Sequence, residues 1–305
     1  MTFDSQRAPV VPLAAILCVG LVAWAYFHNP SQIYDATALV QTLPPDQAVH
    51  SYIDLALLRQ GGYLDLLAGA KASEEPDYKK FVQDTGFDYR TDLDAAAVAF
   101  RNGSVYMALR GKFTWDRLQK YAESHGGRCV DALCGMPATT PGRIISYYKI
   151  QRDVLALAVA PDERAASMIG PLHWKTPPRI PPAVMWVFAP AFAFSDVKAL
   201  PAGSHSFLSP LAETQGVQFT LGPGSGQNLE LRMETTSNSP AQAADLAKRL
   251  TTTTDLLTRM LKRDKMKPTA GDLSGVLVAG HFVAKDAMVT ATWPIDRSFI
   301  QSLLK

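Results

Sequence analysis

Ser195 and Lys198 are the residues whose types and spacing come closest to a catalytic pair in this chain. A lysine near a serine can assist the activation of its hydroxyl, which then acts as a nucleophile. The pair therefore predicts one of the competing functions, a serine hydrolase of the cell envelope; the others are a binding protein and an accessory subunit of a membrane complex.

The Ser-x-x-Lys pattern is the one used by penicillin-binding proteins and β-lactamases. Two further motifs of those enzymes are missing, because Lys175-Thr176 is followed by proline and no Ser-Asp-Asn occurs. A four-letter pattern with two free positions also arises easily by chance. We therefore favour an exposed turn before a short helix at Ser195, and we keep the penicillin-binding type of hydrolase as the alternative.

The histidines and carboxylates predict no metal site. The six histidines lie far apart and form no H-x-x-x-H or H-E-x-x-H pair. Four aspartates gather between residues 84 and 94, but their spacing departs from a calcium loop and basic neighbours offset their charge, which favours a solvated face. The chain contains no P-loop and no G-x-G-x-x-G motif, so no cofactor is expected.

Cys129 and Cys134 have four residues between them in GGRCVDALCGMP. Two thiols in an oxidising compartment usually pair, and the glycines that flank these cysteines suit a short hairpin that brings them together. We predict a disulfide that acts as a local staple, with free thiols as the alternative.

The N-terminal residues predict a membrane segment. Residues 8–27 carry no charge over a length that can cross a bilayer, and Arg7 precedes them. The positive-inside rule then places residues 1–7 in the cytoplasm and the rest of the chain in the periplasm or the exterior, as a single-pass protein of the inner (plasma) membrane. Ala23-Trp24-Ala25 fits a signal-peptidase site, but the bulky Trp24 and Tyr26 favour an uncleaved anchor.

An internal repeat is the clearest sign of organisation. Residues 150–169 align without gaps with residues 283–302, so that Pro161 matches Pro294 and Arg164 matches Arg297. Both halves follow the order strand, hairpin, helix, hairpin, short helix. The first hairpin turns at Asn102-Gly103, a strong hairpin signal.

The two helices of the repeat have their own start signals. Thr114 precedes the helix of the first half, which Gly126-Gly127 ends, while Ser239-Pro240 starts a long helix that runs to about residue 264 in the second half.

The repeat sets the expected domain boundaries. A juxtamembrane helix and linker occupy residues 28–48, repeat 1 spans 49–170, a proline-rich linker spans 171–182, and repeat 2 spans 183–305. Hairpins followed by helices predict an α+β fold made of two tandem related domains, each an antiparallel sheet with helices on one face, behind an N-terminal transmembrane helix.

The charge of the chain excludes one class of function and suggests a surface. Thirty Lys and Arg against 28 Asp and Glu give a formal charge of +2, too balanced for a protein that neutralises many phosphates, so we expect no nucleic-acid partner. Around the end of the long helix of repeat 2, basic residues are concentrated. They complement the helix dipole, or they form a surface for anionic lipid headgroups or an acidic partner. These residues are Lys248, Arg249, Arg259, Lys262, Arg263, Lys265 and Lys267.

The favoured function is therefore that of a membrane-anchored extracytoplasmic binding or assembly protein without catalytic activity. It would act through the duplicated module, with the membrane and a protein or envelope component as partners. We expect the interface between the two repeats to create a cleft for a ligand or partner.

Overall fold

The computed structural model describes residues 34–64, 75–171, 174–176, 178–195, 205–224 and 228–302. The predicted anchor at 8–27 and the residues that precede it lie outside these ranges. Among the helices that are described, none has both the length and the apolar character needed to span a bilayer.

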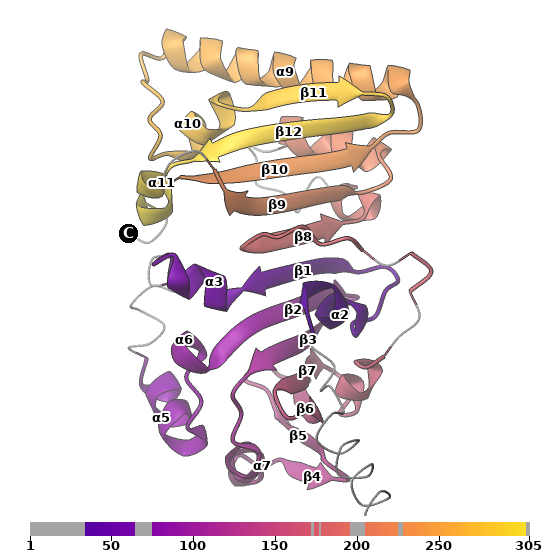
Figure 1. The fold of residues 1–305 in the computed structure, drawn as a ribbon, viewed down its shortest axis with the longest axis vertical. Helices are drawn as coiled ribbons and strands as arrows, with labels where there is room; N and C mark the ends of the chain where they lie inside the picture. Colours follow the sequence, from indigo (N-terminus) through magenta and orange to yellow (C-terminus); the bar gives the residue numbers. More distant parts are fainter. Residues whose placement is uncertain are drawn as a thin grey trace, which may run out of the picture. The chain divides into compact units, whose positions relative to one another are not determined.

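Within the described ranges, twelve strands form a single antiparallel sheet (Figure 1), in the order β11-β12-β10-β9-β8-β1-β2-β3-β7-β6-β5-β4. The strands are β1 (Val49–Asp54), β2 (Leu93–Arg101), β3 (Ser104–Gly111), β4 (Arg128–Val130), β5 (Leu133–Pro137), β6 (Ile144–Gln151), β7 (Val154–Ala160), β8 (Met185–Ala189), β9 (Val217–Pro223), β10 (Leu229–Thr236), β11 (His281–Lys285) and β12 (Met288–Ile295). The prediction of antiparallel sheet with helices is confirmed.

Short α-helices surround most of the sheet, and one long helix lies in the second half of the chain. The α-helices are α2 (Ala36–Gln41), α3 (Leu55–Gln60), α5 (Pro76–Thr85), α6 (Tyr89–Asp92), α7 (Trp115–Ser124), α8 (His205–Leu208), α9 (Pro240–Arg263), α10 (Leu273–Val278) and α11 (Arg297–Ser302). The described residues also form the 3₁₀ helices η1 (Ala165–Met168), η2 (Ala191–Phe194) and η4 (Ser209–Glu213).

The predicted repeat is present in the strand order. In the first half the order β1-β2-β3-β7-β6 matches β8-β9-β10-β12-β11 in the second, with α7 and α9 at equivalent places in the chain. The predicted turn at Asn102-Gly103 has positive φ at both residues, 49° and 70°, which is the geometry of a tight hairpin turn. Ser239 caps α9 by accepting a hydrogen bond from the amide of Gln242, whereas Thr114 precedes α7 without a side-chain cap.

The two repeats are joined edge to edge. The first strands of the repeats, β1 and β8, pair antiparallel, with Tyr52 opposite Trp186 and His50 opposite Phe188. Their junction is thus a backbone ladder rather than two apposed surfaces, and the two sheets expected from the sequence are continuous. Residues 35–305 form one compact unit.

In repeat 1, one face of the sheet consists largely of alanine side chains. Ala97, Ala108 and Ala156 lie side by side across β2, β3 and β7, and each is fully buried. We call this the alanine face. The small side chains leave room for α2, whose Leu39 and Val40 are fully buried and which crosses the strands closely (Figure 1). The sequence predicted α2 as part of a connecting segment, but it is part of the core.

The opposite face carries the larger core. In repeat 2, Leu246 and Leu250 of α9 pack against Val289, Ala291 and other buried residues of the strands. In repeat 1, Leu118 and Ala122 of α7 pack on Tyr147 and Leu155 in the same way. Repeat 2 therefore has the predicted helices on one face, whereas repeat 1 is covered on both faces because α2 and η1 lie on its alanine face.

Candidate binding cleft and basic surface

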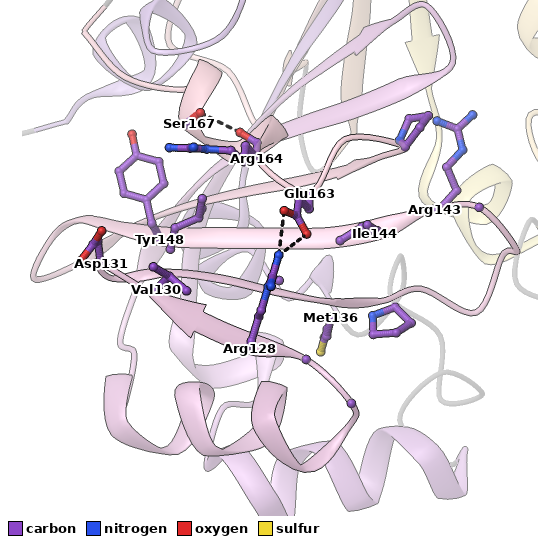
Figure 2. A pocket seen from close by; sticks show the side chains of 17 residues that line it. Arg128, Val130, Asp131, Met136, Arg143, Ile144, Tyr148, Glu163, Arg164 and Ser167 are labelled. Atoms are coloured by element: carbon purple, nitrogen blue, oxygen red, sulfur yellow. Dashed lines mark hydrogen bonds and ion pairs between the residues drawn. The ribbon is translucent and has the colours of Figure 1, made fainter.

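A cleft of about 1130 Å³ lies at the end of the sheet formed by repeat 1. Its floor is the alanine face of β4, β5 and β6, where the ladder places Arg128 opposite Gly135 and Gly135 opposite Ser146. Val130, Leu133 and Ile144 give the floor an apolar character. One wall is the segment 161–167, which follows β7 and includes most of η1 (Figure 2).

An ion pair spans the cleft. The Arg128 Nη2 atom lies 2.9 and 3.0 Å from the two carboxylate oxygens of Glu163, so the guanidinium of the floor donates to the carboxylate of the wall (Figure 2). Both side chains remain open to solvent, with 73% of Arg128 and 52% of Glu163 exposed. An ion pair as exposed as this one contributes little to stability, and its members are free to exchange partners.

The wall is held firmly although the ion pair is exposed. The Ala166 amide donates to the Ser146 hydroxyl at 3.0 Å, and the Tyr148 hydroxyl donates to the Ile169 carbonyl. A Cβ on Gly135 would lie 3.8 Å from the Glu163 carbonyl oxygen, which is an ordinary contact. The two hydrogen bonds of Ser146 and Tyr148 therefore hold the wall in place over the floor.

Two further arginines line the cleft. Arg143 precedes β6 and Arg164 belongs to the wall, and neither side chain forms an ion pair with any residue of the described ranges. The Nη1 atom of Arg143 is buried without a hydrogen-bond partner. In Figure 2 the Arg128–Glu163 pair lies between the guanidinium groups of Arg143 and Arg164. Arg143 is half-buried and Arg164 is exposed, and cations without a counter-charge favour an anionic ligand.

The predicted disulfide is confirmed and supports the floor. Cys129 and Cys134 are directly opposite each other on β4 and β5, with Cα atoms 4.0 Å apart and an S–S bond of 1.99 Å. Asp131 and Ala132 make the turn between the strands, both with positive φ. Because Cys134 is buried against α7, the disulfide fixes the hairpin that carries Arg128.

The cleft lies where the two repeats differ. The hairpin β4–β5 is inserted between α7 and β6, whereas α10 occupies the corresponding place between α9 and β11. A second cavity, of about 580 Å³, lies beside the polar side chains Glu230, Arg232 and Glu234 of β10. Neither cavity is lined by the β1–β8 junction, where the sequence led us to expect a cleft.

The basic residues predicted around α9 are all exposed, but the structure divides them into two groups. Lys248 and Arg249 lie more than two turns before Arg259. Arg249 pairs with Asp245 at 2.7 Å, which leaves it partly neutralised. The other group is compact and includes the two lysines that follow the helix: Arg259, Lys262, Arg263, Lys265 and Lys267.

Exposed apolar side chains accompany this second group. Leu256, Met260, Met266 and Leu273 are 51%, 44%, 58% and 61% exposed. Leu256, Met260 and Arg263 occupy positions i, i+4 and i+7 of α9, so they share one outer face of the helix. We call the stretch of residues 256–273, with these four apolar residues and the five cations between them, the basic-apolar surface.

The remaining candidate residues are not brought together. Ser195 is exposed after η2, and Lys198 lies outside the described ranges, so the catalytic pair is untested. The aspartates at 84–94 serve local structure instead: Asp88 caps α6 and accepts from the Tyr78 hydroxyl at 2.8 Å, while Asp94 pairs with Arg59. Across the residues that are placed, no three His, Cys, Asp or Glu side chains gather as a metal site would require.

The buried titratable groups have structural roles. His50 is 1% exposed, and its Nε2–H donates to the Pro44 carbonyl at 2.8 Å, because that oxygen can only accept. Burial lowers the pKa of His50, the backbone hydrogen bond opposing this in part. Burial raises the pKa of Tyr147 to about 12, and its hydroxyl donates to the Leu118 carbonyl.

The sequence did not identify the cleft. Arg128 and Glu163 are 35 residues apart, and no local pattern links them. One signal was available: the glycine-rich stretch around Cys129 and Cys134 has no counterpart in repeat 2, which marks an insertion.

Comparison with other proteins adds little. No protein-family model matches the chain, and no curated protein matches it. Two solved structures are similar in part, crystal forms III and IV of TP0453, with TM-scores of 0.45 and 0.44 and identities of 11% and 8%. The match covers 87% of this chain and 96% and 95% of those chains. At these values the likeness does not establish a common fold or function.

Proposed function

We propose that the protein is a membrane-anchored, extracytoplasmic binding or assembly protein without catalytic activity. Residues 8–27 anchor it in the inner (plasma) membrane, and the duplicated module of residues 49–170 and 183–305 binds. The basic-apolar surface at the end of α9 is the observation that carries the proposal. Its partners are the membrane and a protein or envelope component.

The composition of the basic-apolar surface suits the interface of an anionic bilayer. Residues 256–273 carry five cations against the two carboxylates Asp264 and Asp272, and Asp264 pairs with Arg263 at 2.9 Å. Each basic side chain near an anionic membrane contributes about 1 kcal/mol. The exposed Leu256 and Met260 can enter the headgroup region, where apolar area adds to the electrostatic attraction.

Three titratable side chains have partners that give them structural roles. His50 and Tyr147 use their polar atoms to hold backbone carbonyls. Asp272 caps α10, accepting from Gly275, Ser274 and Thr269, which holds the pKa of its carboxyl well below the ordinary range. These groups are engaged in folding rather than poised for proton transfer.

Vesicle binding tests the membrane contact. Residues 31–305, which contain the whole compact unit, should sediment with vesicles of 70% phosphatidylcholine and 30% phosphatidylglycerol, but not with pure phosphatidylcholine. Replacing the five cations of the basic-apolar surface by glutamine should abolish this binding. A control variant loses five other exposed cations instead: Lys79, Lys80, Lys112, Lys120 and Arg152. If both variants lose binding equally, overall charge explains it and the assignment fails.

Affinity purification of the tagged full-length protein from gently solubilised membranes tests the binding role. A partner that copurifies in stoichiometric amount is expected. Recovery of the protein without any partner would contradict the assembly role. Cleavage after Ala25 would contradict the anchor.

A further inference from the structure

We propose that the cleft of repeat 1 binds an acidic peptide segment of a partner protein, and that Glu163 occupies the place on Arg128 that a partner's carboxylate takes. This inference rests on the proposed binding function and names the chemistry of the partner. Three arginines from three segments of the chain carry it: Arg128 on β4, Arg143 before β6, and Arg164 in the wall.

The side chains that line the cleft carry more positive than negative charge. Its lining has three arginines against the carboxylates of Asp131 and Glu163. Since Arg128 and Glu163 neutralise each other, Arg143 and Arg164 remain against Asp131, and neither arginine has an ion pair among the described residues. Guanidinium groups bind carboxylates strongly through charge-assisted hydrogen bonds, and in the cleft the Arg128 Nη2 atom already donates to both carboxylate oxygens of Glu163.

Glu163 shows how the cleft accepts a carboxylate. It lies in the irregular segment between β7 and η1, and its side chain reaches over the floor to Arg128 (Figure 2). Both oxygens are engaged, at 2.9 and 3.0 Å, while half of the side chain remains exposed. An acidic side chain from another extended segment can therefore replace it without any change in the floor.

The shape of the cleft favours a peptide over a small molecule. Its volume of about 1130 Å³ is above the range of about 300–1000 Å³ that is usual for small-ligand pockets. The arginines are spread across it rather than converging on one point (Figure 2). Val130, Leu133 and Ile144 lie between them on the floor, where the apolar side chains of an alternating acidic and apolar segment can pack.

The test uses a fluorescein-labelled hexapeptide of alternating Glu and Val, with a matched peptide that has Gln in place of Glu. Binding to the full-length protein in detergent micelles is followed by fluorescence anisotropy at low salt. The Glu peptide should bind about tenfold more tightly than the Gln peptide, as expected for the loss of a charge-assisted hydrogen bond.

Four variants locate the site. Glu163→Gln should tighten binding of the Glu peptide several-fold, because Arg128 loses its internal partner. Arg128→Gln and Arg143→Gln should each weaken it about tenfold. Arg152→Gln, an exposed arginine in the turn between β6 and β7, should leave it unchanged. All four side chains are at least partly exposed, and circular dichroism checks that each variant is folded.

Other outcomes overturn the inference. Unchanged affinity in Glu163→Gln, or equal losses in Arg143→Gln and Arg152→Gln, would place binding elsewhere. Displacement of the peptide by inorganic phosphate, beyond the effect of chloride at the same ionic strength, would make the cleft a general anion site. Failure here, with vesicle binding and a copurifying partner intact, would remove the cleft assignment alone and leave the proposed function standing.

Discussion

The indole ring of Trp174 lies 4.9 Å from the imidazole ring of His50, measured between centroids. Trp174 belongs to the proline-rich segment between the repeats, and its Nε1–H also donates to the Gln41 carbonyl at 3.0 Å. Gly170 donates to the Thr42 carbonyl at 2.9 Å. The segment that leaves repeat 1 is therefore fastened to the end of α2.

His50 should make stability depend on pH. Its pKa lies below the ordinary value of 6.5 in the folded protein, so below that pH the unfolded chain binds a proton that the folded chain excludes. The free energy of unfolding should therefore fall as the pH falls through 6.5 and level off below the folded-state pKa. Urea unfolding between about pH 7.5 and 5.5 measures this slope.

His50→Gln should remove that part of the slope, because glutamine does not titrate and can still donate to the Pro44 carbonyl. His281→Gln, which changes an exposed histidine of β11, is the control and should keep it. Equal slopes in the wild type and His50→Gln would show that His50 is not responsible.

The disulfide should contribute modestly to stability. Replacing Cys129 and Cys134 by serine removes a cross-link between residues that are five positions apart in the sequence. This change should lower the free energy of unfolding by about 2 kcal/mol. A reducing agent should produce a similar loss in the wild type and none in the double variant. No effect of reduction on the wild type would contradict the prediction.

Gly127 should tolerate no side chain. A Cβ there would lie 2.3 Å from the Gly135 carbonyl oxygen and 2.8 Å from that of Ala122, so the hairpin β4–β5 must shift away from α7. Gly127→Ala should cost about 1–3 kcal/mol of the free energy of unfolding. Gly222→Ala is the matched control, because nothing lies within 4 Å of its Cβ. Similar losses in both variants would refute the steric argument.

Ser195 provides the test of the hydrolase alternative. We expect a fluorescent penicillin to label neither the wild type nor Ser195→Ala covalently. Labelling of the wild type that is lost in Ser195→Ala would establish the hydrolase and end the proposal of a non-catalytic protein.

Local signals in the sequence predicted local structure well. The turn at Asn102-Gly103, the Ser239 cap and the disulfide each depend on residues a few positions apart, whose chemistry allows few alternatives. The repeat added the order of the strands, since both halves carry the same succession of signals.

Contacts between distant residues were not predictable in this way. Nothing in the strand 49–54 specifies β8 as its neighbour, because backbone hydrogen bonds carry no residue identity. The burial of Leu39 of α2 on the alanine face and the pair of Arg128 with Glu163 likewise depend on the completed sheet. The candidate cleft was missed for the same reason.

The pairing of β1 with β8 is the geometry of a symmetric homodimer. Each strand meets its own equivalent in the other repeat, antiparallel, as two identical chains would across a twofold axis. Because both strands belong to one polypeptide here, this pairing does not depend on protein concentration. The two halves differ around it: the first carries the stapled hairpin β4–β5, and the second carries the long cationic helix α9.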